Sequence, residues 1–171
     1  MINDGSLKGI ILSGGPDVIT DEDSLKMNSD IFELGIPILG VCYGMQYMSN
    51  YYGEQVIESD VKEYGNNDIT IKSNNALTLN LPTNQTVWMS HGYHVEVGDK
   101  VFDQIAFSNN GHLAMFKHKE REQYGVQFHP EVRNTIHGNE ILENFVNICG
   151  AKKSWSMDNY LEQLVLDIKE E

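Results

Sequence analysis

A cysteine lies where an apolar segment passes into a helical pattern, and this junction constrains the fold more than any other feature. Segment 36–41 is almost entirely apolar, and the helical pattern begins at Met45. Gly40 and Gly44 stand two residues before and two residues after Cys42. Glycines remove Cβ atoms where a chain turns tightly, so the thiol is expected to project from a sharp strand-to-helix turn. A strand that is apolar on both faces is typical of the buried part of a parallel sheet.

Such a turn suits a nucleophile. The N–H groups and the dipole at the start of a helix favour the thiolate form of Cys42 over the thiol. A buried structural cysteine is the alternative that this segment alone leaves open.

The segment Tyr124–Glu131 reads as a second strand, and it ends in a histidine and a carboxylate. Residues i and i+2 of a strand share a face, so His129 and Glu131 are expected to lie together. Pro130 restricts its own φ and favours an extended His129. Alone, His-Pro-Glu also fits a plain strand terminus. Beside the cysteine turn, it indicates a Cys-His-Glu triad.

Several blocks of sequence resemble class I glutamine amidotransferases. The four main blocks occur in the order found in that family: Gly9–Pro16, Gly35–Gln46, Val87–Gly92 and Tyr124–Val132. Cys-Tyr-Gly-Met-Gln and Trp-Met-Ser-His-Gly, with Lys62–Gly65, are most similar to the N-terminal amidotransferase domain of the GMP synthetase branch. The resemblance covers almost the whole chain.

The resemblance implies a mechanism for hydrolysis of L-glutamine. Cys42 would attack the side-chain carboxamide, and His129 would carry the thiol proton to the departing ammonia. Glu131 would hold the imidazole in place, and water would then release glutamate. By the same resemblance, the backbone N–H groups of Gly15 and Tyr43 would form the oxyanion hole.

The resemblance also implies a substrate pocket. Gln46, about one turn beyond Cys42, is similar to the family residue that contacts the amino-acid end of glutamine. An exposed helix glutamine is the alternative reading of that position. Ser90, His91 and Gly92 resemble the wall of the pocket and are expected to contribute backbone contacts.

The chain departs from the branch at two places. Tyr93 stands where an aspartate is usual, and Arg133-Asn134 replaces Thr-His. Both departures bear on substrate affinity and on coupling to a synthetase domain. His91 and His94 are three residues apart, but no cysteine or carboxylate joins them at ligand spacing, so no metal site is predicted.

The predicted fold class is α/β, with an open, mostly parallel sheet, flanking helices and a flavodoxin-like three-layer arrangement. The site is expected at the carboxyl ends of the strands. Residues 1–150 are predicted to form the amidotransferase domain. The family places a strand, a helix and a second strand ahead of the Gly9–Pro16 block, so the strand at 10–12 is expected to have an exposed edge. Residues 151–171 read as a linker helix toward an absent synthetase domain, with packing on the first domain as the alternative.

Composition restricts the partners. A formal net charge of −13 and a pI near 4.7 argue against a nucleic-acid or anionic-membrane surface. The two cysteines, Cys42 and Cys149, favour a reducing cytoplasmic location, because a disulfide would consume the nucleophile. No leader or membrane-spanning segment is expected. No cofactor is expected in this chain, and ATP and Mg²⁺ would belong to the synthetase domain.

The predicted function is a glutaminase that supplies ammonia for the amination of XMP to GMP by an ATP pyrophosphatase domain or subunit. Two alternatives remain open at this point. One is a non-catalytic fragment or regulatory partner that retains the triad. The other is an amidotransferase of another biosynthetic pathway, such as anthranilate or carbamoyl phosphate synthesis.

Overall fold

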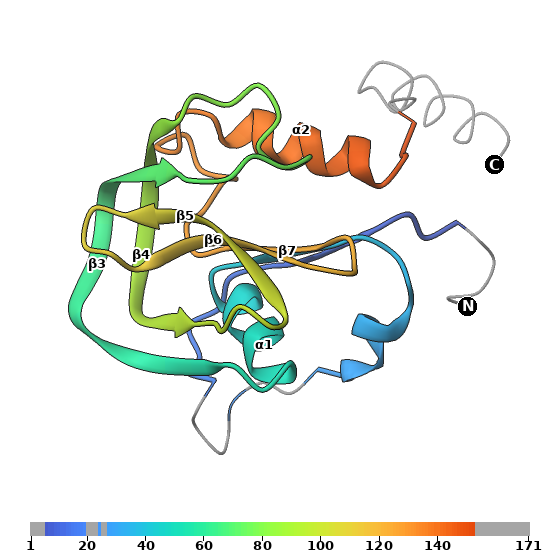
Figure 1. Cartoon of the computed structure of the whole chain (residues 1–171), viewed down its shortest axis with the longest axis horizontal. Coiled ribbons are helices and arrows are strands. Elements are labelled where there is room, and N and C mark those ends of the chain that lie inside the picture. Colours follow the sequence, from blue (N-terminus) through green and yellow to red (C-terminus); the bar gives the residue numbers. More distant parts are fainter. Residues whose placement is uncertain (1–5, 20–23, 25–26, 153–171) are drawn as a thin grey trace, which may run out of the picture.

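A seven-stranded sheet with a helix on each face organises the protein (Figure 1). The structure is a computed structural model that describes residues 6–19, 24 and 27–152. The strand order in the sheet is β1-β2-β7-β6-β5-β3-β4. The strands are β1 (Ile10–Leu12), β2 (Ile38–Val41), β3 (Gln55–Ile71), β4 (Asn84–Glu96), β5 (Phe102–Ser108), β6 (Leu113–His118) and β7 (Gln123–Val126). The helices are the 3₁₀ helix η1 (Ser29–Glu33), α1 (Tyr43–Tyr51) and α2 (Gly138–Ile148).

The α/β fold class is confirmed, and the sheet is more mixed than the sequence predicts. β1, β2 and β7 pair in parallel. All pairings among β3, β4, β5, β6 and β7 are antiparallel. Short connections join β5 to β6 and β6 to β7, and a short connection reverses the chain, which only antiparallel pairing accommodates. In the part of the chain that the structure describes, parallel pairing therefore occurs only around β2, which ends at the cysteine turn and lies between β1 and β7.

The two faces of the sheet hold separate apolar clusters. β2 is buried on both faces, as its composition predicts. Ile38 packs in the cluster that contains the apolar residues of α1. Leu39 and Val41 pack in the cluster that contains those of α2. The alternation along β2 thus directs successive side chains to opposite helices.

The edge of the sheet at β1 is exposed, in line with the expectation for residues 10–12. Within the described residues, β1 pairs only with β2, and Ile11 is 51% exposed.

Four elements differ from the sequence prediction. The spacing of Leu25, Ile31 and Leu34 predicts a helix over 24–34, but within 27–34 only η1 is helical. The Asn28 side chain caps η1 by accepting from the backbone N–H of Asp30. The sequence pattern predicts strands over 68–73 and 86–90 and none over 102–108. The structure has β5 at that last range, and β3 and β4 are much longer than the two predicted strands. The expected tail helix at 157–171 lies outside the described residues, and the boundary at residue 150 stays a prediction.

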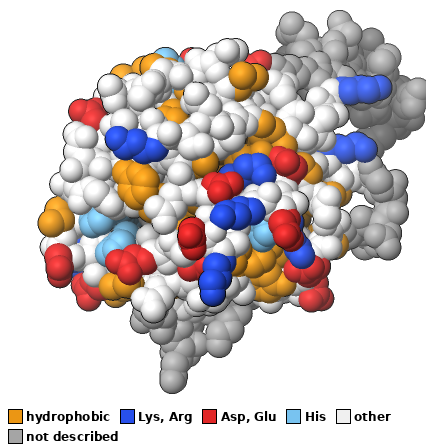
Figure 2. Space-filling model, in the orientation of Figure 1, with side chains coloured by type: hydrophobic (Ala, Val, Ile, Leu, Met, Phe, Trp, Pro, Cys, Tyr) orange, Lys and Arg blue, Asp and Glu red, His pale blue; other side chains and the backbone are white. Residues whose placement is uncertain are grey.

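Charged side chains of both signs are interspersed on the face seen in Figure 2. Three ion pairs join cations to carboxylates around the β6–β7 connection: Lys117–Glu122, Lys119–Asp103 and Arg121–Glu33. On this face the cations do not gather into the basic patch that nucleic acid requires. None of the helices in the described residues is long and apolar enough to cross a membrane.

Candidate active site

The turn at Cys42 is as sharp as its glycines predict. Cys42 precedes the first residue of α1 and has φ 51° and ψ −105°. A positive φ is rare for a residue with a side chain and is found at functional turns. A Cβ on Gly40 would lie 2.7 Å from the Gly44 backbone, and one on Gly44 would lie 2.2 Å from the Leu12 carbonyl oxygen. Only glycine fits at these two positions, which brings α1 close against β1 and β2.

His129 and Glu131 lie together, although not for the reason that the sequence suggests. β7 ends at Val126, so both residues follow the strand instead of sharing a strand face. The turn that follows still places His129 Nδ1 2.8 Å from Glu131 Oε1. This contact leaves Nε2 of the imidazole for another partner. The side chain of His129 is largely buried, whereas that of Glu131 is half exposed.

Cys42 and His129 meet beside Gly14. A Cβ on Gly14 would lie 2.8 Å from His129 Cε1 and 3.6 Å from the Cys42 Cβ. A hydrogen bond with Cys42 is the largest influence on the imidazole and raises the pKa of His129. Burial opposes this effect, the hydrogen bond with Glu131 adds to it, and the pKa becomes about 9. The cationic imidazole is therefore the stable form at neutral pH, and it stabilises a thiolate partner.

Glu131→Gln is expected to lower the pKa of His129, because the substitution removes a negative charge from the imidazole. The pKa of His129 in the folded state lies above the ordinary value. Protonation of the His129 ring therefore adds to the free energy of unfolding, in full below about pH 6.5. This contribution is lost as the pH rises through about 9. NMR titration of the His129 ring should give a lower midpoint in the variant. An unchanged midpoint would mean that another group holds the imidazole.

A buried threonine anchors the backbone of His129 to β4. The Thr135 hydroxyl donates to the His129 carbonyl at 2.6 Å and accepts from the Trp88 N–H at 3.0 Å. The His129 N–H in turn donates to the Trp88 carbonyl at 3.0 Å. The turn that carries the imidazole is thus tied to a strand that is distant in sequence.

Thr135→Val is expected to destabilise the protein by about 1–3 kcal/mol, because it leaves the Trp88 N–H and the His129 carbonyl, both partly buried, without this hydrogen-bond partner. Thermal or urea unfolding measures the effect. Thr86→Val is the matched control, since Thr86 on β4 makes its bond to Asp68 at the surface. Equal losses in the two variants would contradict the anchoring role.

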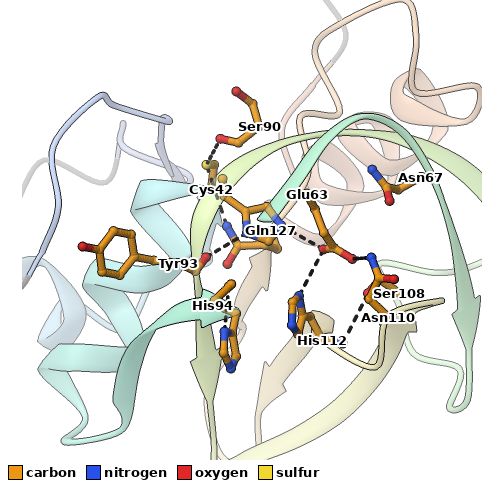
Figure 3. Close-up of polar contacts among 12 residues, drawn as sticks. Cys42, Glu63, Asn67, Ser90, Tyr93, His94, Ser108, Asn110, His112 and Gln127 are labelled. Carbon is orange, nitrogen blue, oxygen red and sulfur yellow. Dashed lines mark hydrogen bonds and ion pairs between the residues drawn. The ribbon is translucent and has the colours of Figure 1, made fainter. Parts of the chain in front are cut away.

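Two further groups surround the thiol (Figure 3). Cys42 Sγ lies 3.9 Å from the Ser90 carbonyl oxygen, and Gln127 Nε2 lies 3.8 Å from Sγ. Gln127 is fully buried just before His129. This glutamine was not predicted from the sequence. The sequence signal that could have identified Gln127 is its position within the block Tyr124–Val132, two residues before His129.

A pocket of about 340 Å³ opens beside the thiol. Its lining contains every residue that the sequence places in the oxyanion hole or the substrate site: Gly15, Tyr43, Gln46, Ser90, His91 and Gly92. Gly15 faces the Tyr43 ring, since a Cβ there would lie 3.7 Å from it. Tyr43 begins α1, where backbone N–H groups have no partner within the helix. Gln46 is buried, so it is not an exposed helix glutamine, and its Nε2 donates to the Tyr93 carbonyl at 3.2 Å.

The other side of the pocket comes from an irregularity in the β3–β4 ladder. Glu58 pairs with Tyr93 and Glu63 pairs with His91, so four residues of β3 lie opposite Gly92 alone. Such a bulge redirects side chains. It brings Lys62 and Tyr64 into the pocket lining. A Cβ on Gly92 would lie 3.4 Å from the Lys62 side chain, so β4 and the Lys62 side chain approach each other closely at this point. Asp17 lines the pocket as well, and none of these three lining residues was predicted from the sequence.

The histidines outside the candidate triad are mostly packed against other side chains. His94 stacks on His112 with ring centroids 4.5 Å apart, and His118 packs against Tyr52 and Phe102. His137 lies at the surface beside Glu140. Among the described residues, no three His, Cys, Asp or Glu side chains are arranged to hold a metal ion. Both cysteines are free thiols.

The fold and the site define a class of protein. The family model of class I glutamine amidotransferases matches residues 2–149. The chain therefore belongs to the class I glutamine amidotransferase family.

Named relatives narrow the resemblance within that family. The chain is 46% identical over 163 residues to a GMP synthase [glutamine-hydrolyzing] of Listeria monocytogenes, and 47% identical over 165 residues to that of Lactobacillus gasseri. Each match covers 95% of this chain and 32% of the relative, so the chain spans about a third of their length. A putative GMP synthase subunit from Thermoplasma acidophilum is similar in structure, with a TM-score of 0.74 and 30% identity. That match covers 85% of this chain and 74% of the other.

Proposed function

We propose that this chain hydrolyses L-glutamine to glutamate and ammonia. The observation that carries the proposal is the placement of Cys42, at a strained helix start, against the His129–Glu131 pair at the edge of a pocket. A nucleophile, a base in contact with it and a third group that orients the base are what acyl transfer through a covalent intermediate needs.

Each step has a group positioned for it. Cys42 Sγ attacks the carboxamide carbon, and its proton resides on His129. The backbone N–H groups of Gly15 and Tyr43 receive the negative charge of the tetrahedral intermediate. The C–N bond then breaks, and ammonia leaves with the proton from His129. Water, deprotonated by His129, attacks the thioester, and glutamate and free Cys42 result.

The pocket suits a small amino acid with a polar side chain. Among the described residues, its lining includes the Asp17 carboxylate and the Lys62 ammonium, which complement the two charges of a free amino acid. Gln46 lies one turn from Cys42 and lines the same pocket. We assign the contacts with the amino-acid end of glutamine to this group of side chains, and the pocket wall to Ser90, His91 and Gly92.

We further propose that the ammonia serves the amination of XMP to GMP. The support is the similarity to enzymes named GMP synthase [glutamine-hydrolyzing], of which this chain spans about a third. The ATP-using step would take place on a separate ATP pyrophosphatase domain or subunit, which would hold ATP and Mg²⁺. We place the reaction in the cytoplasm.

Glutamate release from glutamine by the purified chain tests the hydrolysis. Asparagine, shorter by one methylene, is the control substrate, because its carboxamide would stop short of Sγ when its charged end is bound. Release from glutamine but not from asparagine supports the proposal. No release from folded protein, alone or with an ATP pyrophosphatase subunit, would favour a non-catalytic or regulatory role.

A further inference from the structure

A buried carboxylate lies directly behind the pocket wall (Figure 3). Glu63 is 1% exposed, and its Oε2 is 3.0 Å from His91 Nε2 and 3.5 Å from His112 Nδ1. Its other oxygen accepts a hydrogen bond from Asn110 Nδ2 at 2.8 Å. The catalytic scheme uses none of these contacts, and burying a carboxylate without such partners is costly.

Glu63 is held in its ionised form. Burial raises its pKa, but contacts with His91, Ser108 and Asn110 outweigh burial and bring the pKa well below the ordinary value. The Glu63 Oε2 atom faces His91 Nε2 at 3.0 Å, and both side chains are almost completely buried at this contact. Glu63 therefore holds the His91 ring from the side opposite the pocket.

The opposite nitrogen of His91 contacts the pocket wall. His91 Nδ1 lies 2.8 Å from the Tyr93 carbonyl oxygen, which can only accept, so this nitrogen donates. The same oxygen accepts from Gln46 Nε2. At the other end of the wall, the Ser90 carbonyl lies beside Cys42 Sγ. The His91 ring thus links Glu63 to a wall segment that contacts both the thiol and Gln46.

We propose that Glu63 is a positioning residue for glutamine, which acts through the His91 ring to hold the segment Ser90–Tyr93 in its binding shape. This inference rests on the proposed glutamine hydrolysis. A pocket whose carbonyl groups are already in position binds glutamine without an entropic cost of ordering. A pocket wall that must first become ordered lowers the affinity for glutamine. Loss of the carboxylate should weaken glutamine binding more than it slows the chemistry at Cys42.

Two alkylating reagents separate pocket shape from thiol chemistry. Iodoacetamide requires only the Cys42 thiol, whereas 6-diazo-5-oxo-L-norleucine, a glutamine-shaped diazoketone, requires the thiol and the pocket together. Glu63→Gln keeps the size and the bond from Asn110 but removes the charge. We expect about a tenfold higher half-saturating diazoketone concentration. The KM for glutamine should rise similarly, with little change in kcat or in iodoacetamide reactivity.

Gln85→Met is the matched control, because Gln85 on β4 is another buried polar residue, and its side chain donates to the Pro82 carbonyl, away from the pocket wall. It should leave both reagents unaffected. Should Glu63→Gln fail to fold, Glu63→Asp, which draws the charge away from His91, carries the same test with the same expected direction.

A double-mutant cycle with His91→Asn tests the route of the effect. If Glu63 acts through His91, the double variant should be no worse than the more affected single variant. If the losses in glutamine affinity of the two single variants multiply in the double variant, the proposed route through His91 is wrong. If Glu63→Gln keeps the wild-type KM and the wild-type half-saturating diazoketone concentration, the positioning role is wrong. In either case glutamine hydrolysis would stand. A wild-type chain that iodoacetamide modifies at Cys42 but the diazoketone does not would instead refute the glutamine site, and this inference with it.

Discussion

Cys42→Ser should abolish glutamate release, with a loss of about 10³-fold or more, while the fold remains intact. A serine hydroxyl is far less ionised than a thiol at neutral pH, so the adjacent imidazole cannot supply an equivalent nucleophile. The side chain differs by one atom, and its neighbours Ser90 and Gln127 lie 3.9 and 3.8 Å from Sγ. The thermal unfolding midpoint should therefore change little. Coupled detection of glutamate and circular dichroism give the two measurements.

The second cysteine provides the matched control. Cys149 lies just after α2, is partly buried and packs beside Gly9, and burial raises its pKa. Cys149→Ser should retain glutamate release and rapid modification by iodoacetamide, whereas Cys42→Ser should lose both. Near-wild-type hydrolysis by Cys42→Ser would remove this residue as the nucleophile.

Gly44→Ala should destabilise the protein by several kcal/mol, although alanine is the better helix former by about 1 kcal/mol. The new Cβ would lie 2.2 Å from the Leu12 carbonyl oxygen and 2.7 Å from the Leu12 Cβ. Neither atom belongs to a flexible chain end, so α1 and β1 must separate. Urea unfolding should show a lower midpoint. Glutamate release should fall as well, because Cys42 lies at the start of the displaced helix.

Gly98→Ala separates this clash from any general intolerance of glycine replacement. A Cβ there would meet only the Glu54 carboxylate, at an ordinary contact distance of 3.8 Å. This variant should unfold at the wild-type midpoint. A Gly44→Ala protein as stable as wild type would mean that the close approach of α1 to β1 is not required.

Local patterns were sufficient to predict the nucleophile turn. The apolar run of β2, the glycines around Cys42 and the pattern that begins at Met45 act over a few residues, and the observed turn and helix follow from them. His129 and Glu131 were also expected to meet. The expected cause, a shared strand face, is wrong, because their positions depend on a turn that Thr135 and Trp88 anchor from outside the segment.

The effect of the departures from the GMP synthetase branch also could not be predicted from the sequence, because it depends on tertiary contacts. The tyrosine at 93 replaces a charged residue, but the contacts with His91 and Gln46 both go to its backbone carbonyl. Any residue can supply that acceptor. At 133–135 the replaced residues leave Thr135, whose hydroxyl holds the His129 turn.

By itself, the sequence determined the fold class and the nucleophile turn, because glycines, apolar runs and helix starts impose their geometry locally. The family resemblance added six of the residues that line the thiol pocket. Only the tertiary structure decided the long antiparallel β3–β4 ladder, the bulge opposite Gly92 and the buried Glu63–His91 contact. The physical reason is that strand register and the burial of a charge depend on partners far along the chain. Glu63 reads as one more surface carboxylate in an acidic protein until the pairing of β3 with β4 places it against His91, behind the pocket.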